Sequence, residues 1–208
     1  MKIIAHRGND GVHKENSLEA IVSSLNSKYT DGVEFDIRFT KDHKFIVSHD
    51  LFTNGFFINK TCIKKLQKQG LNTLEEILMN VKNDKIILIE VKEERKHFKY
   101  LTFKLVNVLK KYNLNYYICS FNYDFLKYFK KKYPNYKAGL LIGKKTNLKH
   151  VNNDFDFNSI YIGNLDKNKK ENVFTWTVND YSLLDGKMIN VITDNCKKIY
   201  NSMHNIES

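Results

Sequence analysis

Short apolar runs alternate along the chain with longer stretches in which apolar residues recur every three or four positions. The short runs are bounded by polar and loop-forming residues, which is typical of buried β-strands. Eight of them occur in series, at residues 2–6, 32–40, 85–92, 116–121, 137–143, 159–163, 173–179 and 190–194. A further extended segment, residues 45–48, follows a turn at residues 41–43 and is expected to form an extra hairpin arm.

The stretches with helical spacing lie between these strands. Helices are expected at residues 18–28, 74–81, 93–112 and 123–133. Asn16 or Ser17 can cap the first helix, and Asn72 or Thr73 the second, because these side chains accept hydrogen bonds from free amide groups. The fourth helix ends before Pro134, the only proline.

Eight strands that alternate with helices predict an α/β fold, a compact (β/α)₈ TIM barrel. The 208 residues are fewer than the roughly 250 that are typical of this fold. The helices near residues 148–155 and 166–171 must therefore be brief or absent. No linker or low-complexity run divides the chain, so residues 1–208 are expected to form a single domain.

Polar side chains of different chemistry fall in or at the ends of the predicted strands. The carboxyl ends of barrel strands meet around one mouth, where active sites form. The residues are His6, Arg7, Glu34, Asp36, Glu90, Lys92, Ser120, Trp176, Thr193 and Asp194. The pattern therefore predicts one site at the mouth of the barrel.

Charge and cysteine content bear on the binding partners and on the cellular compartment. The net charge is +11, mostly from lysine clusters, which indicates solvated helix faces with a general attraction for anions such as an anionic membrane. No recognition motif favours nucleic acid as a partner. The three cysteines have no CxxC spacing, which argues against disulfides and a structural zinc site and favours a reducing compartment. No signal peptide or membrane-spanning run is evident, so a cytoplasmic location is expected.

Three carboxylates lie within apolar strand runs. Glu34 and Asp36 are two residues apart and therefore project from one face of their strand, and Glu90 comes from a neighbouring strand. A lone glutamate is usually a surface residue paired with a lysine, but three in apolar runs indicate a shared cation. An all-oxygen set suits magnesium or calcium, with manganese as an alternative.

His6 and His49 could serve as further metal ligands, but they are better placed as a proton-transfer pair, one base and one acid. Arg7 and Lys92 add two cations suited to a phosphate group. Trp176 fits barrel packing and a platform for the organic part of a substrate about equally well. No P-loop or GxGxxG motif is present, so no nucleotide cofactor is indicated.

Together these motifs resemble the glycerophosphodiester phosphodiesterase family, in order along nearly the whole chain. The matching segments are HRG at His6, ENSLEA at Glu15, GVEFDIRFTKDHKFIVSHD at Gly32, NTLEEIL at Asn72, LIEVK at Leu88, WTVN at Trp176 and TDN at Thr193.

The resemblance implies a role for each matching residue. Glu34, Asp36 and Glu90 would bind one divalent cation, and His6 and His49 would be the catalytic acid and base. The remaining substrate-binding residues would be Arg7 and Lys92 on the phosphate, Asn16 in a supporting role and Trp176 beside the alcohol.

Three departures from the family pattern concern loops. Lys14 replaces a frequent proline, Asn195 and Cys196 replace the usual residues after TD, and the segment between His49 and Glu90 is short. The last departure predicts a reduced insertion after the second strand, which bears on substrate choice.

The expected function is metal-dependent hydrolysis of glycerophosphodiesters to an alcohol and glycerol 3-phosphate, on a small-molecule or lipid-derived substrate. One alternative is lysophospholipase D-like or sphingomyelinase D-like cleavage of a lipid, which peripheral contact with an anionic membrane would assist. Another is a basic binding module without catalysis. Glycoside hydrolysis by a carboxylate pair would need neither Arg7 nor two histidines.

Overall fold

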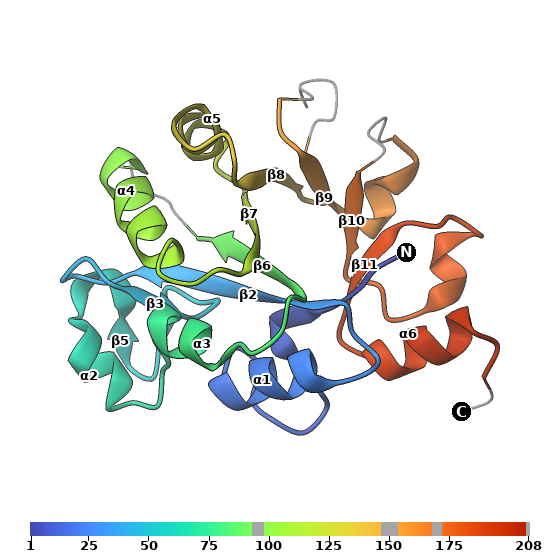
Figure 1. Cartoon of the computed structure of the whole chain (residues 1–208), viewed down its shortest axis with the longest axis horizontal. Helices are drawn as coiled ribbons and strands as arrows, with labels where there is room; N and C mark the ends of the chain where they lie inside the picture. Colours follow the sequence, from blue (N-terminus) through green and yellow to red (C-terminus); the bar gives the residue numbers. More distant parts are fainter. Residues whose placement is uncertain (93–97, 147–153, 168–171, 207–208) are drawn as a thin grey trace.

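The computed structural model describes residues 1–92, 98–146, 154–167 and 172–206. Eight parallel strands close into a barrel with helices on its outside, so the predicted (β/α)₈ barrel is confirmed (Figure 1). The strands are β1 (Ile3–Ala5), β2 (Gly32–Phe39), β6 (Ile86–Val91), β7 (Asn115–Ser120), β8 (Lys137–Ile142), β9 (Phe157–Tyr161), β10 (Val173–Trp176) and β11 (Asn190–Thr193).

Closure of the barrel depends on β1. This strand pairs in parallel with β2, where Ile4 lies opposite Gly32, and with β11, where Ile3 lies opposite Val191. The expected hairpin arm is β3 (Phe45–Val47), which pairs antiparallel with the outer part of β2. The first and last barrel strands therefore share one seam.

Helices on the outside begin where the sequence predicts caps. The Ser17 side chain accepts from the Ala20 amide at the start of α1 (Leu18–Asn26), and Thr73 forms a capping box with Glu76 at α3 (Leu74–Asn80). The other long helices are α4 (Phe98–Leu109), α5 (Tyr123–Lys132) and α6 (Cys196–Met203). The sequence did not predict α6. Residues 93–97, predicted to start α4, lie outside the described residues.

The chain is short for a (β/α)₈ barrel, and within the described residues the later connections between strands carry no long helix. A 3₁₀ helix, η4 (Ile162–Lys167), follows β9, and another, η5 (Tyr181–Leu184), follows β10. The brief helices expected near residues 148–155 and 166–171 fall largely on residues 148–153 and 168–171, which lie outside the described residues.

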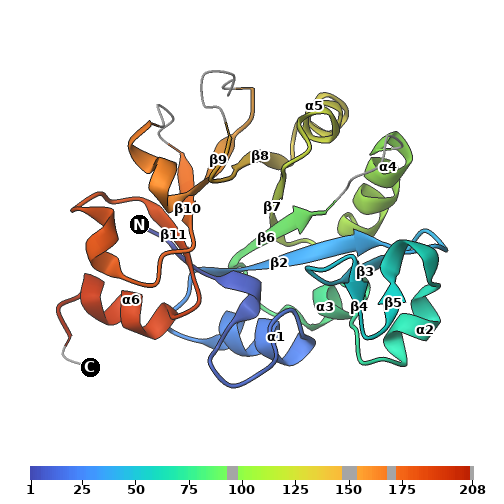
Figure 2. The same ribbon diagram turned by 180° about the vertical axis from the view of Figure 1, so that it is seen from behind.

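Residues 50–72 form a small unit that the sequence pattern did not predict. It contains the hairpin strands β4 (Phe52–Thr53) and β5 (Phe56–Phe57), a 3₁₀ turn η2 (Ile58–Lys60), and α2 (Ile63–Gln67). Ile58 and Leu66 pack with Ile46 of β3 in a cluster of their own. This unit occupies the insertion after the second barrel strand and lies at one edge of the molecule, beside β3 (Figure 2).

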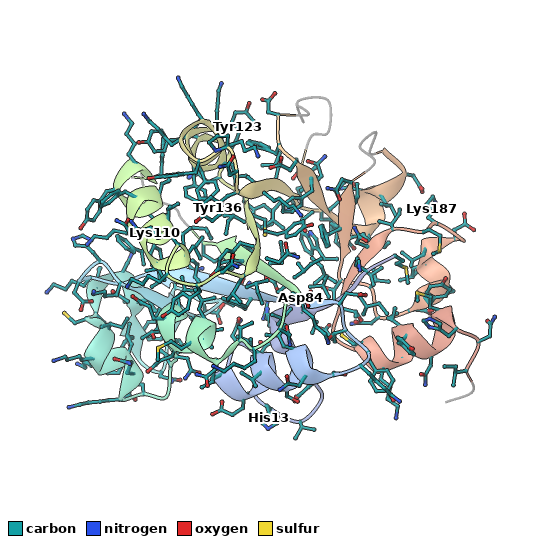
Figure 3. The ribbon with its side chains drawn as sticks, viewed as in Figure 1. His13, Asp84, Lys110, Tyr123, Tyr136 and Lys187 are labelled. Atoms are coloured by element: carbon teal, nitrogen blue, oxygen red, sulfur yellow. The ribbon has the colours of Figure 1, made fainter. Side chains whose placement is uncertain are left out.

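Two further apolar cores stabilise the barrel itself. The larger core lies between the barrel and its helices, where for example Tyr136 contacts Phe129 of α5 with ring centroids 5.8 Å apart. Tyr136 is labelled in Figure 3. The smaller core includes a three-ring cluster inside the barrel, in which Tyr117, Phe157 and Phe174 pack with centroids 5.4 to 5.7 Å apart. Gly139 leaves room for this cluster, because a Cβ atom there would lie 2.2 Å from the Phe157 ring.

Candidate active site

Three buried carboxylates lie together on β2 and β6. Asp36 is directly opposite Glu90 in the parallel ladder, and Glu34 projects from the same face as Asp36, two residues earlier. Their exposed fractions are 5% for Glu34, 1% for Asp36 and 8% for Glu90. One oxygen atom from each lies within 4.8 Å of the other two.

Crowding separates the proton affinities of these groups. Burial, followed by the charges of Asp36 and Glu90, raises the pKa of Glu34 well above its usual range. Burial and the Asp36 charge raise the pKa of Glu90 to about 7. Burial acts against ionisation of Asp36 as well, but Lys92 and a hydrogen bond from Asn16 lower its pKa. Asp36 is therefore the member most readily ionised.

Two cations flank the carboxylates. The Lys92 Nζ atom lies 2.6 Å from Glu90 Oε1 and 3.2 Å from Asp36 Oδ1, and Arg7 Nε lies 3.5 Å from Asp36 Oδ2. Arg7 also binds the more exposed Glu15 through Nη1 at 2.9 Å. Lys92 and Arg7 thus both lie beside Asp36, the lysine at Oδ1 and the arginine at Oδ2.

The donor set fits a hard divalent cation. All three side chains offer carboxylate oxygens, and these oxygens are close enough to share one ion. Burial and, after it, repulsion between the carboxylates raise the pKa of Glu34 and of Glu90, and Lys92 offsets this only in part. A divalent cation between the three side chains would relieve this repulsion.

The HRG segment owes its shape to an unusual backbone turn. Arg7 has a positive φ of 52°, and its amide donates to Glu34 Oε2 at 3.0 Å. Gly8 follows with φ of 67°, and a Cβ atom at this position would lie 2.8 Å from Ile21 of α1. Only glycine fits this turn, which brings a backbone donor to one of the carboxylates.

Asn16 holds Asp36 from outside the cavity. Its Nδ2 atom donates to Asp36 Oδ2 at 2.9 Å, and its Oδ1 atom accepts from the Asp36 amide at 3.1 Å. The Asn16 amide in turn donates to the Arg7 carbonyl at 2.8 Å. Asn16 therefore orients Asp36 and the HRG turn, in line with the supporting role that the resemblance implies.

Both predicted histidines have a carboxylate partner on Nδ1. The His6 Nδ1 atom lies 2.6 Å from Asp194 Oδ1, and His49 Nδ1 lies 2.8 Å from Asp50 Oδ1. These contacts lower the pKa of both aspartates. With Nδ1 engaged, Nε2 is the nitrogen that remains for proton transfer.

One cavity of about 200 Å³ brings these groups together. Eight of the nine predicted site residues line it, and Asn16 lies behind Asp36. The predicted residues in the lining are His6, Arg7, Glu34, Asp36, His49, Glu90, Lys92 and Trp176. The remaining wall consists of Cys119, Phe121, Leu141, Ser159 and Ile192. One side of the cavity is therefore charged and the other is largely apolar.

Trp176 stands at the apolar side. Its ring makes edge contacts with Phe121 and Tyr161, with centroids 6.2 and 5.8 Å apart. Its buried Nε1 atom has no hydrogen-bond partner among the described residues, and neither has Ser159 Oγ. Both are therefore buried polar atoms whose hydrogen-bonding capacity is unmet within the described residues.

Several neighbours of the site were assigned no specific role from the sequence. Asp194 stood among the polar residues at strand ends, but nothing in the sequence paired it with His6. Asn179 accepts from the Asp194 amide at 2.9 Å and donates to Asp194 Oδ2 at 2.8 Å. These bonds join the last residue of the WTVN motif to the middle residue of the TDN motif. Phe121 and Ser159 carried no signal beyond their place near strand ends.

Comparisons with known proteins identify the family of the chain. The model of the glycerophosphoryl diester phosphodiesterase family matches residues 6–198. YhdW of Bacillus subtilis is 27% identical over 86% of this chain and 87% of its own length.

Solved structures share the fold. A glycerophosphodiester phosphodiesterase from Parabacteroides distasonis has a TM-score of 0.85 at 23% identity, covering 98% of this chain and 97% of its own. An Oleispira antarctica phosphodiesterase, solved with the product sn-glycerol-3-phosphate, has a TM-score of 0.82 at 22% identity and the same coverage. Since the family model spans nearly all of the barrel, the chain belongs to the glycerophosphoryl diester phosphodiesterase family, whose members are phosphoric diester hydrolases.

Proposed function

We propose that the protein hydrolyses glycerophosphodiesters to an alcohol and glycerol 3-phosphate. The observation that carries the proposal is the single cavity in which three buried carboxylates meet two carboxylate-bound imidazoles and two cations. Membership of the family and the product bound in the Oleispira antarctica relative support the choice of substrate. The described residues include no helix long and apolar enough to cross a membrane.

Glu34, Asp36 and Glu90 would hold one divalent cation, magnesium or calcium, with manganese as an alternative. When bound, such a cation withdraws negative charge from phosphate oxygens and so favours attack at phosphorus. Asn16 keeps Asp36 oriented, and the Arg7 amide does the same for Glu34. These contacts fix two of the three carboxylates before any ligand arrives.

Arg7 and Lys92 would bind the phosphate. Both lie within 3.5 Å of Asp36, so their charges are already concentrated at the acidic side of the cavity. As phosphorus gains a fifth oxygen, negative charge grows on the phosphate oxygens, and fixed cations stabilise it most at that stage. Arg7 adds donors in a planar fork, and Lys92 acts as a point charge.

His6 and His49 would move the protons. One imidazole removes a proton from the attacking oxygen through Nε2, and the other protonates the leaving alkoxide. Asp194 and Asp50 hold the Nδ1 atoms and favour the charged imidazolium that forms during the reaction. Each transfer is worth roughly 10²- to 10⁴-fold in rate. The attacking oxygen belongs either to water or to a hydroxyl group of the substrate. Attack by the substrate hydroxyl gives a cyclic phosphate first.

A second candidate substrate is a lysophospholipid, as in lysophospholipase D-like or sphingomyelinase D-like cleavage. The observation that favours it is the apolar wall of the cavity, formed by Phe121, Leu141, Trp176 and Ile192. The same wall suits the organic part of a small diester, with Trp176 beside the alcohol. Direct comparison of the two substrates separates these cases.

The test is an assay of the purified protein on glycerophosphocholine with magnesium, calcium or manganese. We expect EDTA to abolish turnover, and His6→Ala and His49→Ala each to lower kcat at least about 100-fold while leaving the fold intact. His13→Ala is the control, because His13 binds Asp10 through Nδ1 at 2.6 Å but does not line the cavity. Full activity of either cavity variant would contradict the assigned pair.

Product analysis completes the experiment. Choline and glycerol 3-phosphate support direct hydrolysis, whereas a cyclic phosphate shows attack by a substrate hydroxyl. Faster release of choline from a lysophospholipid would favour the second candidate. Salt-dependent binding of nucleic acid without turnover of any diester would instead favour a basic module that has lost catalysis.

A further inference from the structure

The hairpin segment, residues 51–70, exposes two phenylalanines at one edge of the molecule. Phe52 of β4 and Phe57 of β5 are 53% and 47% exposed, although their rings pack against each other with centroids 4.9 Å apart. Single exposed apolar side chains are common, but a paired aromatic patch on a two-residue hairpin indicates contact with something apolar.

The same segment is uniformly basic. Residues 51–70 contain Lys60, Lys64, Lys65 and Lys68 and no Asp or Glu. The Lys60 Nζ atom lies 5.3 Å from the Phe57 ring centroid, and Lys65 Nζ lies 4.3 Å from that of Phe56. Positive charge thus lies beside the exposed Phe57 ring and the partly buried Phe56 ring, and basic groups beside aromatic rings are the combination found at membrane interfaces.

Contacts with the β2–β3 turn place this segment on the open side of the barrel. The Lys41 amide donates to the Thr61 carbonyl at 3.1 Å, and the Ile63 amide donates to Asp42 Oδ1 at 2.9 Å. Residues 41 and 42 follow the carboxyl end of β2, the end of the barrel at which the cavity lies. Figure 1 shows β5 and α2 beside β3, next to that end of β2.

Other apolar side chains are exposed in loops that follow strand carboxyl ends. Val12 follows β1 and is 83% exposed, and Phe121 follows β7 and is 52% exposed. Phe121 also lines the cavity. The hairpin segment and these two loops therefore all lie on the side of the barrel where the strands have their carboxyl ends, and each carries an exposed apolar side chain.

We propose that the hairpin segment docks the protein on the surface of an anionic lipid bilayer. Phe52 and Phe57 would enter the headgroup region, and the four lysines would lie against anionic lipids. A bilayer fits better than nucleic acid, because the two rings meet at 57° and shield each other rather than offering parallel faces to bases. The binding goes beyond the proposed function, since it needs no turnover.

The first experiment is sedimentation of the full chain with vesicles of phosphatidylcholine, with and without phosphatidylglycerol. We expect binding only to the anionic vesicles. Changing Phe52 and Phe57 to Ser should weaken partitioning at least about tenfold. Changing Lys60, Lys64, Lys65 and Lys68 to Gln should weaken it by about fivefold for each lysine. Turnover of soluble glycerophosphocholine should not change in either variant.

Matched controls come from the outer helices. Phe103→Ser on α4 removes a phenylalanine that is 52% exposed, and a second control changes Lys110, Lys127, Lys131 and Lys132 to Gln. Both controls should keep wild-type partitioning. Equal losses in the controls, or equal binding to neutral vesicles, would overturn the proposal. So would binding of an RNA oligonucleotide with no binding of vesicles.

A second measurement does not depend on the folding of variants. Cys62 of the hairpin segment is exposed, whereas Cys119 and Cys196 are buried, so a thiol-reactive, environment-sensitive dye labels Cys62 selectively. Docking predicts a blue shift of its emission with anionic vesicles and none with phosphatidylcholine alone. An unchanged spectrum in a sample that sediments with vesicles would show that another surface binds.

Discussion

His6 Nδ1 and Asp194 Oδ1 lie 2.6 Å apart, although 188 positions separate the two residues in the chain. His6 follows the first barrel strand and Asp194 follows the last, and these two strands pair only when the barrel closes. One imidazole of the candidate site therefore receives its carboxylate partner across the closing seam.

Asp194→Asn should lower kcat for glycerophosphocholine by about 10- to 100-fold and change KM little. The amide keeps the size of the side chain but loses the charge that favours an imidazolium on His6. Steady-state kinetics measure the split between kcat and KM. Asp180→Asn is the control, because Asp180 only caps η5 through Ser182. A rise in KM at unchanged kcat would argue against a role in proton transfer.

Glu34→Gln should stabilise the cation-free protein and abolish stabilisation by cations. Burial, together with the charges of Asp36 and Glu90, raises the pKa of Glu34, so a neutral glutamine removes the cost of holding a buried charge at pH 8. Thermal unfolding in EDTA, and then with each divalent cation, measures both effects. Glu75→Gln on α3 provides a control, since Glu75 pairs with Lys111 outside the cavity. A less stable Glu34→Gln protein in EDTA would contradict the expectation.

Stability of the EDTA-treated protein should fall as the pH rises from about 5 to about 8. The folded state raises the pKa of Glu90 from 4.5 to about 7, mainly through burial and the Asp36 charge. Between these values the folded chain binds more protons than the unfolded chain, so the free energy of unfolding decreases with pH. Urea unfolding across this range measures the slope. Glu90→Gln should flatten it, and an unchanged slope in that variant would assign the effect elsewhere.

Gly8→Ala should destabilise the protein by about 1 to 3 kcal/mol. Its Cβ atom would meet Ile21 at 2.8 Å, and its φ of 67° is unfavourable for any other residue. Gly11→Ala separates the two causes, because Gly11 has φ of 79° but nothing within 4 Å of the position that a Cβ atom would take. Urea unfolding should show a larger loss for Gly8→Ala. Equal losses in the two variants would mean that backbone strain alone causes the destabilisation.

Periodicity predicted the barrel because each strand is an apolar run of its own. The ends were less certain: His6 lies in a 3₁₀ turn, η1 (His6–Gly8), instead of β1, and β10 ends at Trp176, three residues before its predicted end. Both ends carry site residues: His6 follows the last paired residue of β1, and Trp176 is the last paired residue of β10. The local pattern therefore misplaced the strand ends at two positions of the site.

Alternation within β2 placed Glu34 and Asp36 on one face without knowledge of the fold. By contrast, contacts between distant residues could not be predicted, because they depend on which strands become neighbours. Asp194 beside His6 is one example, and Phe121 beside Trp176 is another. The hairpin segment was missed for a different reason: its strands are two residues long and show no periodicity.

The packed rings of Tyr117, Phe157 and Phe174 fill the interior of the barrel, so the cavity does not continue through them. Under the proposed reaction, both products must leave by the route through which the next substrate enters. Product release and substrate entry then use the same opening. The phosphorylated product would be held by the same cations as the substrate and would therefore act as a competitive inhibitor. A protein docked by its hairpin segment would exchange molecules with the layer of water at the lipid surface.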